Sequence, residues 1–444
     1  MGAAGRVPAG GGGHFGAEAP AVASLAAMLM LLQSQISNPP PVHVPVVGSV
    51  WLIGALFLGH IIFGTLSMGI VVLAPSYELV GMVRGRPWMD RFANGLATTN
   101  IKVFSFGATL AAFAVTMMLP LWSNLFVRLW TLFWLPMLTA FLTWVVTITL
   151  LLIYVYRWNR MSARSQPAHV AVGYAAALSE HSFLFLIVGL DSYMLTPNGA
   201  SSWGAIFNAS FWEELVHRFI GDISWVSLLA AAVMVLYGAA NRDEVQRGYY
   251  GLAARASLVV GFVALVPQAV SGFFFAEAIR SASPGAFQIS FTGGLAWLWL
   301  VQQFLFGVVL LAVNVYFLQS RPRPNPAGLS LTVVITLLSA LTVLPAAWYL
   351  GYFWVRYILL FGSLLLTGGH CLLWWRSRLA AWAEPLLRRS SGRLLLTAGG
   401  VVALLLVLLM GTIRETARGP YTVYGEQTQQ QGESHFQPPR GYFP

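Results

Sequence analysis

Two histidines in this 444-residue chain open the same short pattern in separate hydrophobic stretches. The pattern H-x-x-x-G-x-x-S occurs at His60-Gly64-Ser67 and at His217-Gly221-Ser224. On a helix, these offsets place the imidazole, the glycine and the hydroxyl on one face. An imidazole beside missing side-chain volume suits a helix that holds a flat macrocycle by its metal, so the pattern indicates haem. The alternative is that the glycine allows two helices to pack closely beside a few polar side chains, which requires no cofactor.

The composition places these histidines in a membrane. Hydrophobic residues make up 57% of the chain and charged residues 9%, whereas soluble domains carry about 25% charged residues. Runs of about 20 apolar residues can cross a bilayer as helices, which satisfy their own backbone groups. The sequence therefore predicts an all-α integral membrane protein of about ten transmembrane helices in packed bundles. The predicted spans are 46–75, 97–121, 129–155, 170–195, 217–238, 254–277, 291–318, 328–349, 353–375 and 394–413.

The spans divide the chain into three parts. Residues 46–413 form the predicted haem-binding membrane domain, and residues 414–444 form a polar tail. Residues 1–45 precede the first span and contain a short apolar stretch, Ala21 to Leu32, which is too short to cross a bilayer. We interpret this stretch as interfacial or signal-like.

The net charge of +10 describes topology and not nucleic-acid binding. Of the 25 basic residues, 16 fall in alternate loops and 8 fall on the other side, tails included. Positive residues mark the cytoplasmic side of a membrane protein. The sequence therefore predicts that both termini lie on the outer side of a bacterial-type inner (cytoplasmic) membrane, with the lipid bilayer and no nucleic acid as partner.

Ionisable side chains inside spans are costly and are functional candidates. Snorkelling at span ends explains Lys102, Asp191 and Glu277. We expect Asp222 to pair with Arg218, one turn before it. The remaining candidates are His60, Glu180, His181, His217 and His370, of which His370 is expected at the membrane interface.

His60 and His181 are predicted to lie at similar depth, because each is about 14 residues from the outer end of its span. They are therefore a plausible pair of ligands to one iron. Glu180 and His181 are also consistent with a proton path or an internal hydrogen-bonded pair. Cys371 is the sole cysteine, so no Cys-x-x-Cys-His attachment exists and haem would be held without covalent bonds.

The order of several motifs resembles subunit I of the cytochrome bd quinol oxidases, over residues 46–320 and at one later motif. His60 opens the resemblance in the first span, and Thr116-Met117 ends the second. The sequence SYMLTPNG ends the fourth span, and the segment Phe207 to Trp212 leads to His217. Near the end, RETARGPYTVYGE is similar to the family's Glu-x-x-Arg-x-Pro-aromatic stretch, carried by Glu415, Arg418, Pro420 and Tyr421.

The resemblance implies roles for several of these residues. His60 corresponds to the axial ligand of the oxygen-reducing haem, and His217 to one ligand of the low-spin haem b. Glu415 and Arg418 join them as cofactor-binding candidates, as do Gly64 and Gly221 beside the histidines. Quinol or quinone is a further ligand that the resemblance allows.

Three departures from the family pattern bear on mechanism. Threonines near Thr139 and Thr147 stand where the family's third span carries two glutamates. The family's second low-spin ligand is a methionine, but this chain has none from Val235 to Leu409 and offers Gln302 and Gln303. The long quinol-binding loop is reduced to about residues 278–290.

These departures favour electron transfer over oxygen chemistry, because a third span without an acid cannot relay protons by itself. We expect a b-type cytochrome that passes electrons within a redox complex. Its partners would be another membrane subunit and a periplasmic c-type cytochrome. The alternatives are a divergent terminal oxidase, with proton delivery through Glu180 or another subunit, and a haem-free membrane anchor.

Overall fold

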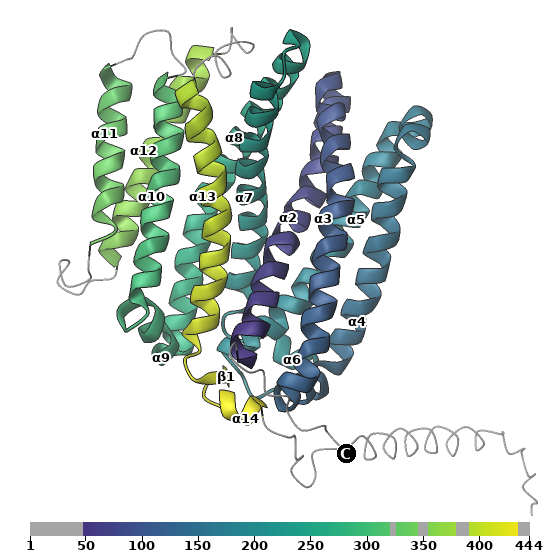
Figure 1. The fold of residues 1–444 in the computed structure, drawn as a ribbon, viewed down its shortest axis with the longest axis vertical. Helices are drawn as coiled ribbons and strands as arrows, with labels where there is room; N and C mark the ends of the chain where they lie inside the picture. The colour runs from purple at the N-terminus through teal and green to yellow at the C-terminus, as the bar shows by residue number, and fades with distance from the viewer. Residues whose placement is uncertain (1–47, 320–325, 345–353, 379–389, 434–444) are drawn as a thin grey trace, which may run out of the picture.

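The computed structural model describes residues 48–319, 326–344, 354–378 and 390–433, and these form a bundle of long helices (Figure 1). The first four long helices are α2 (Ser49–Arg84), α3 (Pro87–Leu121), α4 (Ser123–Tyr156) and α5 (Trp158–Leu195). Next come α7 (Phe211–Ala240), α8 (Glu244–Ala282), α10 (Ala296–Gln319), α11 (Pro326–Leu341), α12 (Trp354–Arg378) and α13 (Ser390–Ala417). The short elements are α6 (Trp203–Ile206), α9 (Pro284–Phe287), the π-helix η1 (Gln288–Thr292), β1 (Tyr421–Val423), β2 (Gln427–Thr428) and α14 (Gln429–Glu433).

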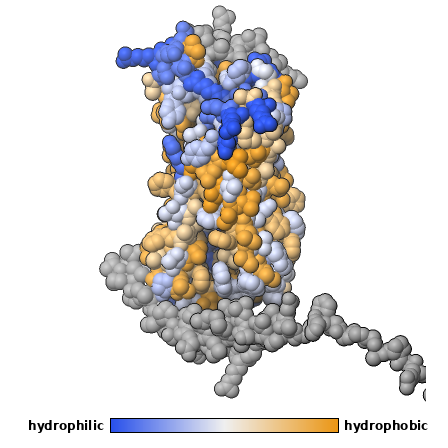
Figure 2. Space-filling view, turned by 90° about the vertical axis from the view of Figure 1, so that its right-hand side faces the viewer, coloured by the Kyte–Doolittle hydropathy of each residue, from blue (hydrophilic) through white to orange (hydrophobic). Residues whose placement is uncertain are grey.

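The all-α membrane class is confirmed. Within the described residues, nine helices are long and apolar enough to cross a membrane. The tenth predicted span, 328–349, begins as α11, a 16-residue apolar helix, and then runs into positions outside the described residues. The apolar stretch Ala21–Leu32 also lies outside them. Figure 2 shows hydrophobic residues along the middle of the bundle and hydrophilic ones gathered towards its upper end.

Short connections make consecutive helices antiparallel neighbours. The first hairpin ends α2 at Gly85, whose φ of 57° is left-handed and suits glycine, and Pro87 then begins α3. The pairs α2–α3, α4–α5 and α7–α8 pack in this way. The last long helix, α13, returns to the centre and packs between α7 and α10 (Figure 1).

Small residues set how closely these helices approach. A Cβ atom at Gly400 of α13 would lie 2.4 Å from the Cβ of Ala232 in α7, and one at Gly69 of α2 would lie 2.4 Å from the backbone oxygen of Asp222 in α7. No side chain fits at either contact. Close approach at these points brings α2, α7 and α13 together in the middle of the molecule.

The chain after α13 folds back over one end of the bundle, which we call the tail end and which lies at the bottom of Figure 1. Here β1 and β2 form an antiparallel pair in which Tyr421 opposes Thr428. The Tyr424 amide donates to the Met194 carbonyl at 2.9 Å, and Asn124 donates to the Gln431 carbonyl at 2.5 Å. The tail end also holds α6, α9 and η1.

Candidate functional site

Three of the predicted histidines share one hydrogen-bond arrangement. The Nδ1 atom lies 2.9 Å from the Gly107 oxygen in His60, 2.8 Å from the Ala177 oxygen in His181 and 3.1 Å from the Gln268 oxygen in His217. A carbonyl oxygen only accepts, so Nδ1 carries the proton and Nε2 keeps its lone pair. Histidines that ligate a metal are held in this way by a carbonyl or carboxylate behind the ring.

His217 is fixed by α8. Its ring lies against Gly272, where a Cβ atom would be 2.9 Å from Cε1, and Nδ1 is also 3.2 Å from the Ser271 hydroxyl. The Phe275 ring stacks on the imidazole with centroids 6.1 Å apart. These contacts hold the ring and occupy Nδ1, so Nε2 remains for another ligand.

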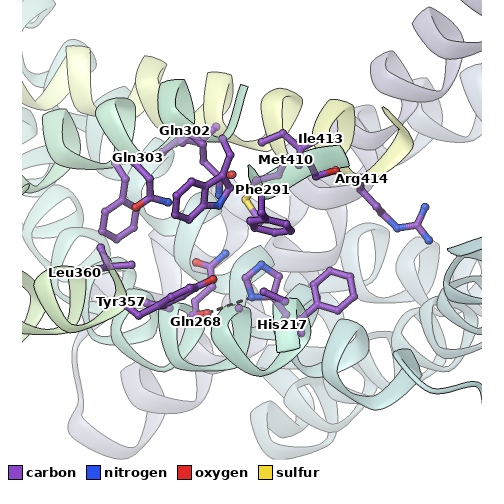
Figure 3. A pocket seen from close by; sticks show the side chains of 18 of the residues that line it. His217, Gln268, Phe291, Gln302, Gln303, Tyr357, Leu360, Met410, Ile413 and Arg414 are labelled. Carbon is purple, nitrogen blue, oxygen red and sulfur yellow. Dashed lines mark hydrogen bonds between the residues drawn. The ribbon is translucent and has the colours of Figure 1, made fainter. Parts of the chain in front are cut away.

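A cavity of about 130 Å³ opens beside His217. Its walls come from α7, α8, α10, α12 and α13 and from η1, and Figure 3 shows side chains of all these elements around it. Most lining side chains are apolar or aromatic, among them Phe291, Tyr357, Leu360 and Met410. The polar ones are His217, Gln268, Ser290, Gln302, Gln303 and Arg414. The apolar lining with a few placed polar groups is of the kind found in cofactor sites. The volume is smaller than the roughly 300–1,000 Å³ of such sites, so a cofactor would enter only if side chains such as Phe291 moved.

Arg414 lines the edge of this cavity, and Figure 3 shows its guanidinium directed away from His217. Its guanidinium contacts Asp191 at 2.7 Å, Glu214 at 3.0 Å and Glu415 at 2.9 Å. Its Nη2 atom is buried and makes no hydrogen bond within the described residues. A buried donor without a partner is costly. This donor is therefore available to a carboxylate that extends past the cavity edge.

Arg414 belongs to a cluster of alternating charges at the tail end. Arg218 contacts Asp191 at 2.5 Å and Glu214 at 3.2 Å, so its partners are these carboxylates and not the expected Asp222. Arg418 pairs with Glu415 and donates to the Thr422 carbonyl at 2.6 Å. Glu415 and Arg418 therefore lie beside the cavity edge and join α13 to the tail.

The glycine and serine of the His217 pattern serve helix packing. A Cβ atom at Gly221 would lie 2.7 Å from Nε2 of Gln268, and Ser224 donates to the Gly261 carbonyl at 2.9 Å. The space beside Gly221 is therefore filled by α8. In the other pattern Gly64 lies beneath the His60 ring, with a built Cβ 3.7 Å from Cε1. Ser67 donates to Glu180 at 2.6 Å.

This Ser67–Glu180 bond fixes the register of α2 against α5. His60 lies seven residues from Ser67 towards the tail end, and His181 lies one residue from Glu180 in the same direction. At 1.5 Å per residue, His60 is about 9 Å closer to the tail end than His181. The two histidines therefore differ in depth and do not lie at the similar depth that was predicted, because the ends of α2 and α5 are not level.

Glu180 and His181 do not bond to each other but share a polar interface of α2, α5 and α7. Glu180 is 2% exposed, and its second oxygen has no partner within the described residues. Buried Nε2 of His181 is likewise without one. Asp222 of α7 accepts a hydrogen bond from Thr65 and lies near enough to Glu180 for their charges to interact. The interface thus places two carboxylates and an imidazole inside the bundle.

The two threonines of the third span do not form part of that interface. Thr147 bonds to Ser179 at 2.9 Å and to the Thr143 carbonyl at 2.8 Å, and Thr139 bonds within its own helix. No Asp, Glu or Lys occurs in α4. The helix therefore offers hydroxyl groups but no acid.

Two other histidines are buried inside the bundle. His370 was expected at the interface but is 1% exposed, with Nδ1 at 2.9 Å from Asn314 of α10. His169 was not among the sequence candidates and is fully buried in α5, with its ring nitrogens 2.7 Å from Glu78 and 2.8 Å from the Tyr154 carbonyl. Both nitrogens of His169 are used, so this pair joins helices and leaves no free ligand atom.

The residues that sequence reasoning missed are Met410 and Arg414. They are four positions apart in α13 and line the same cavity as His217. Their i, i+4 spacing was visible in the sequence, but nothing in it placed the last helix beside α7. Within the described residues, no group of three or more His, Cys, Asp or Glu side chains could hold a metal ion. A haem needs only one or two axial side chains, so these histidines still fit it.

Comparisons with known proteins agree with the fold and with the earlier resemblance. The family model of cytochrome bd terminal oxidase subunit I matches residues 49–288, more than half of the chain. The structure is similar to that of the bd oxidase from Geobacillus thermodenitrificans, with a TM-score of 0.60 and 15% sequence identity. The match covers 87% of this chain and 90% of that one, and at this identity it shows the fold. No curated protein matches the chain.

Proposed function

Because the chain belongs to the cytochrome bd terminal oxidase subunit I family, we propose that it is a b-type cytochrome subunit that transfers electrons in a membrane redox complex. The observation that carries this proposal is the cavity beside His217. An imidazole with Nδ1 bonded to a carbonyl and Nε2 left over faces an apolar space.

The residues around the cavity fit a haem b in three respects. His217 offers a neutral imidazole nitrogen to iron. Arg414 offers a buried donor to a carboxylate, and haem carries two propionates. Aromatic and aliphatic walls exclude water from the remaining surface. Haem b, when bound, would supply a one-electron redox centre whose potential depends on its axial ligands and the polarity around it.

Each nearby residue would have a separate task. Gln268 and Ser271 orient the His217 ring, and Gly272 lets it lie against α8. Gly221 allows the Gln268 amide to approach α7. Glu415 and Arg418 would hold the α13 end, and through it Arg414, in place.

His60 and His181 are proposed ligands of a further haem, because each keeps Nε2 free of the backbone bond at Nδ1. Gly64 leaves room beneath the His60 ring. The difference in depth argues that they do not face one another across a single iron. We propose His60 as the main candidate and His181 as a side chain of the polar interface next to it.

The setting of the subunit is proposed from the same features. No soluble electron-entry domain is present among the described residues, so electrons would come from another membrane subunit or from a periplasmic c-type cytochrome in a bacterial inner membrane. The segment 278–290, which stands in place of a quinol loop, folds as α9 and η1, and Ser290 lines the cavity. Quinol would therefore need a site built differently from the loop.

The proposal is tested by a reduced-minus-oxidised absorbance spectrum of the purified protein. We expect the bands of b-type haem. A protein purified with its native lipids and supplied with haem during expression, yet devoid of such bands, would support a haem-free anchor and contradict the proposal.

A divergent terminal oxidase is the second candidate, favoured by Glu180. Its buried free oxygen could take up a proton inside the bundle, which α4 cannot do. Oxygen uptake with an artificial electron donor distinguishes the two functions. We expect no sustained uptake by the electron-transfer subunit. An oxidase would consume oxygen, and Glu180→Gln, which keeps the size but not the acid, would reduce that rate.

A further inference from the structure

A second potential haem ligand, Met410, lines the His217 cavity from α13, a helix on which no motif predicts a ligand. Its thioether sulfur is on the cavity side of α13 and is drawn above His217 in Figure 3. Met410 is the only methionine after Met234 in the chain. It is also the only methionine among the residues that line this cavity.

An ion pair shows that Met410 and His217 lie at the same depth. Arg414 of α13 contacts Glu214 of α7 at 3.0 Å, which fixes the register of the two helices. His217 is three residues deeper than Glu214, about 4.5 Å, and Met410 is four residues deeper than Arg414, about 6 Å. The two side chains therefore differ in depth by about 2 Å and project into one space.

The rival donors in the cavity are amides. Gln302 and Gln303 come from α10, at the start of the seventh long apolar helix, and Gln303 is buried. The side chains that hold haem iron in proteins are His, Met, Cys and Tyr, and a soft thioether beside imidazole gives a low-spin centre of raised potential. An amide is a weaker donor to iron. Chemistry therefore favours Met410 over either glutamine.

We propose that Met410 is the second side chain that would hold a haem iron in this cavity, so that α7 would supply His217 and α13 would supply Met410. This inference rests on the proposed function. The Phe291 ring is drawn between the two side chains in Figure 3, and it would turn aside when the macrocycle is bound. Because η1 is a short π-helix that follows the four-residue helix α9 and ends at Gly293, its side chains can move without displacing a long helix.

The experiment compares full-length wild-type protein with Met410→Leu and Gln303→Leu. Leucine keeps the volume of methionine but removes the sulfur. The wild type should show a low-spin ferric spectrum, and its ferrous form should not bind carbon monoxide at this haem. Met410→Leu should become high-spin and bind carbon monoxide at unchanged haem content, while Gln303→Leu, the matched control, should resemble the wild type.

A low-spin, carbon-monoxide-insensitive Met410→Leu protein would overturn the assignment, as would loss of the low-spin spectrum in Gln303→Leu alone. If Met410→Leu fails to accumulate, Met410→His replaces it. That variant should stay low-spin at a lower midpoint potential, because thioether ligation raises the potential; an unchanged potential would exclude Met410. Absence of haem from the wild type would overturn the proposed function as well. A bound haem whose spectrum is unchanged by substitution of Met410 would overturn this inference only.

Discussion

Buried polar side chains in this bundle fall into two kinds. Those whose hydrogen-bonding atoms are all used tie helices together, as His169 does with Glu78 and the Tyr154 carbonyl. Those that keep an unused atom next to other polar groups are the candidates for chemistry, as Glu180 and Arg414 are. The distinction depends on the second ring nitrogen or second carboxylate oxygen, which the residue type does not reveal.

We predict that His169→Ala destabilises the protein without affecting its cofactor. The substitution leaves buried Glu78 with the Tyr154 hydroxyl but without its histidine partner, and breaking a buried pair in this way costs about 3–5 kcal/mol. Thermal unfolding in detergent should show a clearly lower midpoint, while the absorbance per folded chain stays that of the wild type. A loss of haem bands at unchanged thermal stability would instead assign His169 to the cofactor.

At the residue scale the sequence identified His60, His181 and His217 but could not rank them. Which of them is the best candidate for a haem ligand depends on whether its imidazole faces a cavity or a neighbouring helix. Met410 was missed because the family's methionine position lies on another helix, and a ligand supplied by α13 requires knowledge of which helices are neighbours. His169 was not singled out because it precedes the predicted span 170–195, whereas α5 begins at Trp158 and includes it.

Helix contacts in this molecule depend on a few glycines at points of close approach. Gly69 is the tightest between α2 and α7, since an added Cβ would lie 2.4 Å from the Asp222 oxygen and 2.5 Å from a Val226 methyl carbon. The oxygen belongs to the backbone and cannot turn away. Any side chain at this position must separate the two helices.

Gly69→Ala should therefore destabilise the bundle by about 1–3 kcal/mol, the range expected for overpacking. The control is Gly95→Ala in α3, where an added Cβ meets nothing within 4 Å. Alanine favours a helix over glycine by up to about 1 kcal/mol, so the control should be neutral or slightly stabilising. Equal unfolding midpoints for the two variants would refute this account of the α2–α7 contact.

At the element scale, hydropathy predicted that the long helices exist but not how far they extend. Hydropathy detects only the part of a helix that lies in the apolar bilayer core. Helix α2 continues to Arg84, beyond the predicted end of its span at residue 75. Register was also out of reach, because it is set by glycine contacts and by bonds such as Ser67 to Glu180. His60 and His181 therefore do not lie at the similar depth that was predicted.

The whole molecule is organised around its last long helix. Through Arg414, α13 contacts Asp191 of α5 and Glu214 of α7, and through its other face it packs on α10. The chain then continues into β1, which contacts α5, and into α14, which covers the start of α4. One helix therefore supplies the cavity with Met410 and Arg414 and joins both sides of the bundle.

The residues that line the cavity therefore lie both inside and beyond the part of the chain that the family model matches. The family model ends at residue 288, whereas half of the cavity comes from η1, α10, α12 and α13 beyond it. The matched part contributes His217 and its support from α8. The later helices contribute the opposite wall, where this chain departs from the family pattern.

The amount of haem per chain in His217→Ala shows directly whether His217 holds a haem. The matched control is His370→Gln, which changes another buried histidine outside the cavity and can keep its bond to Asn314. We predict that His217→Ala loses the haem of this cavity, so that its haem-to-protein ratio falls by one or to zero, while His370→Gln keeps the wild-type ratio. An unchanged ratio in folded His217→Ala protein would mean that His217 does not hold the haem.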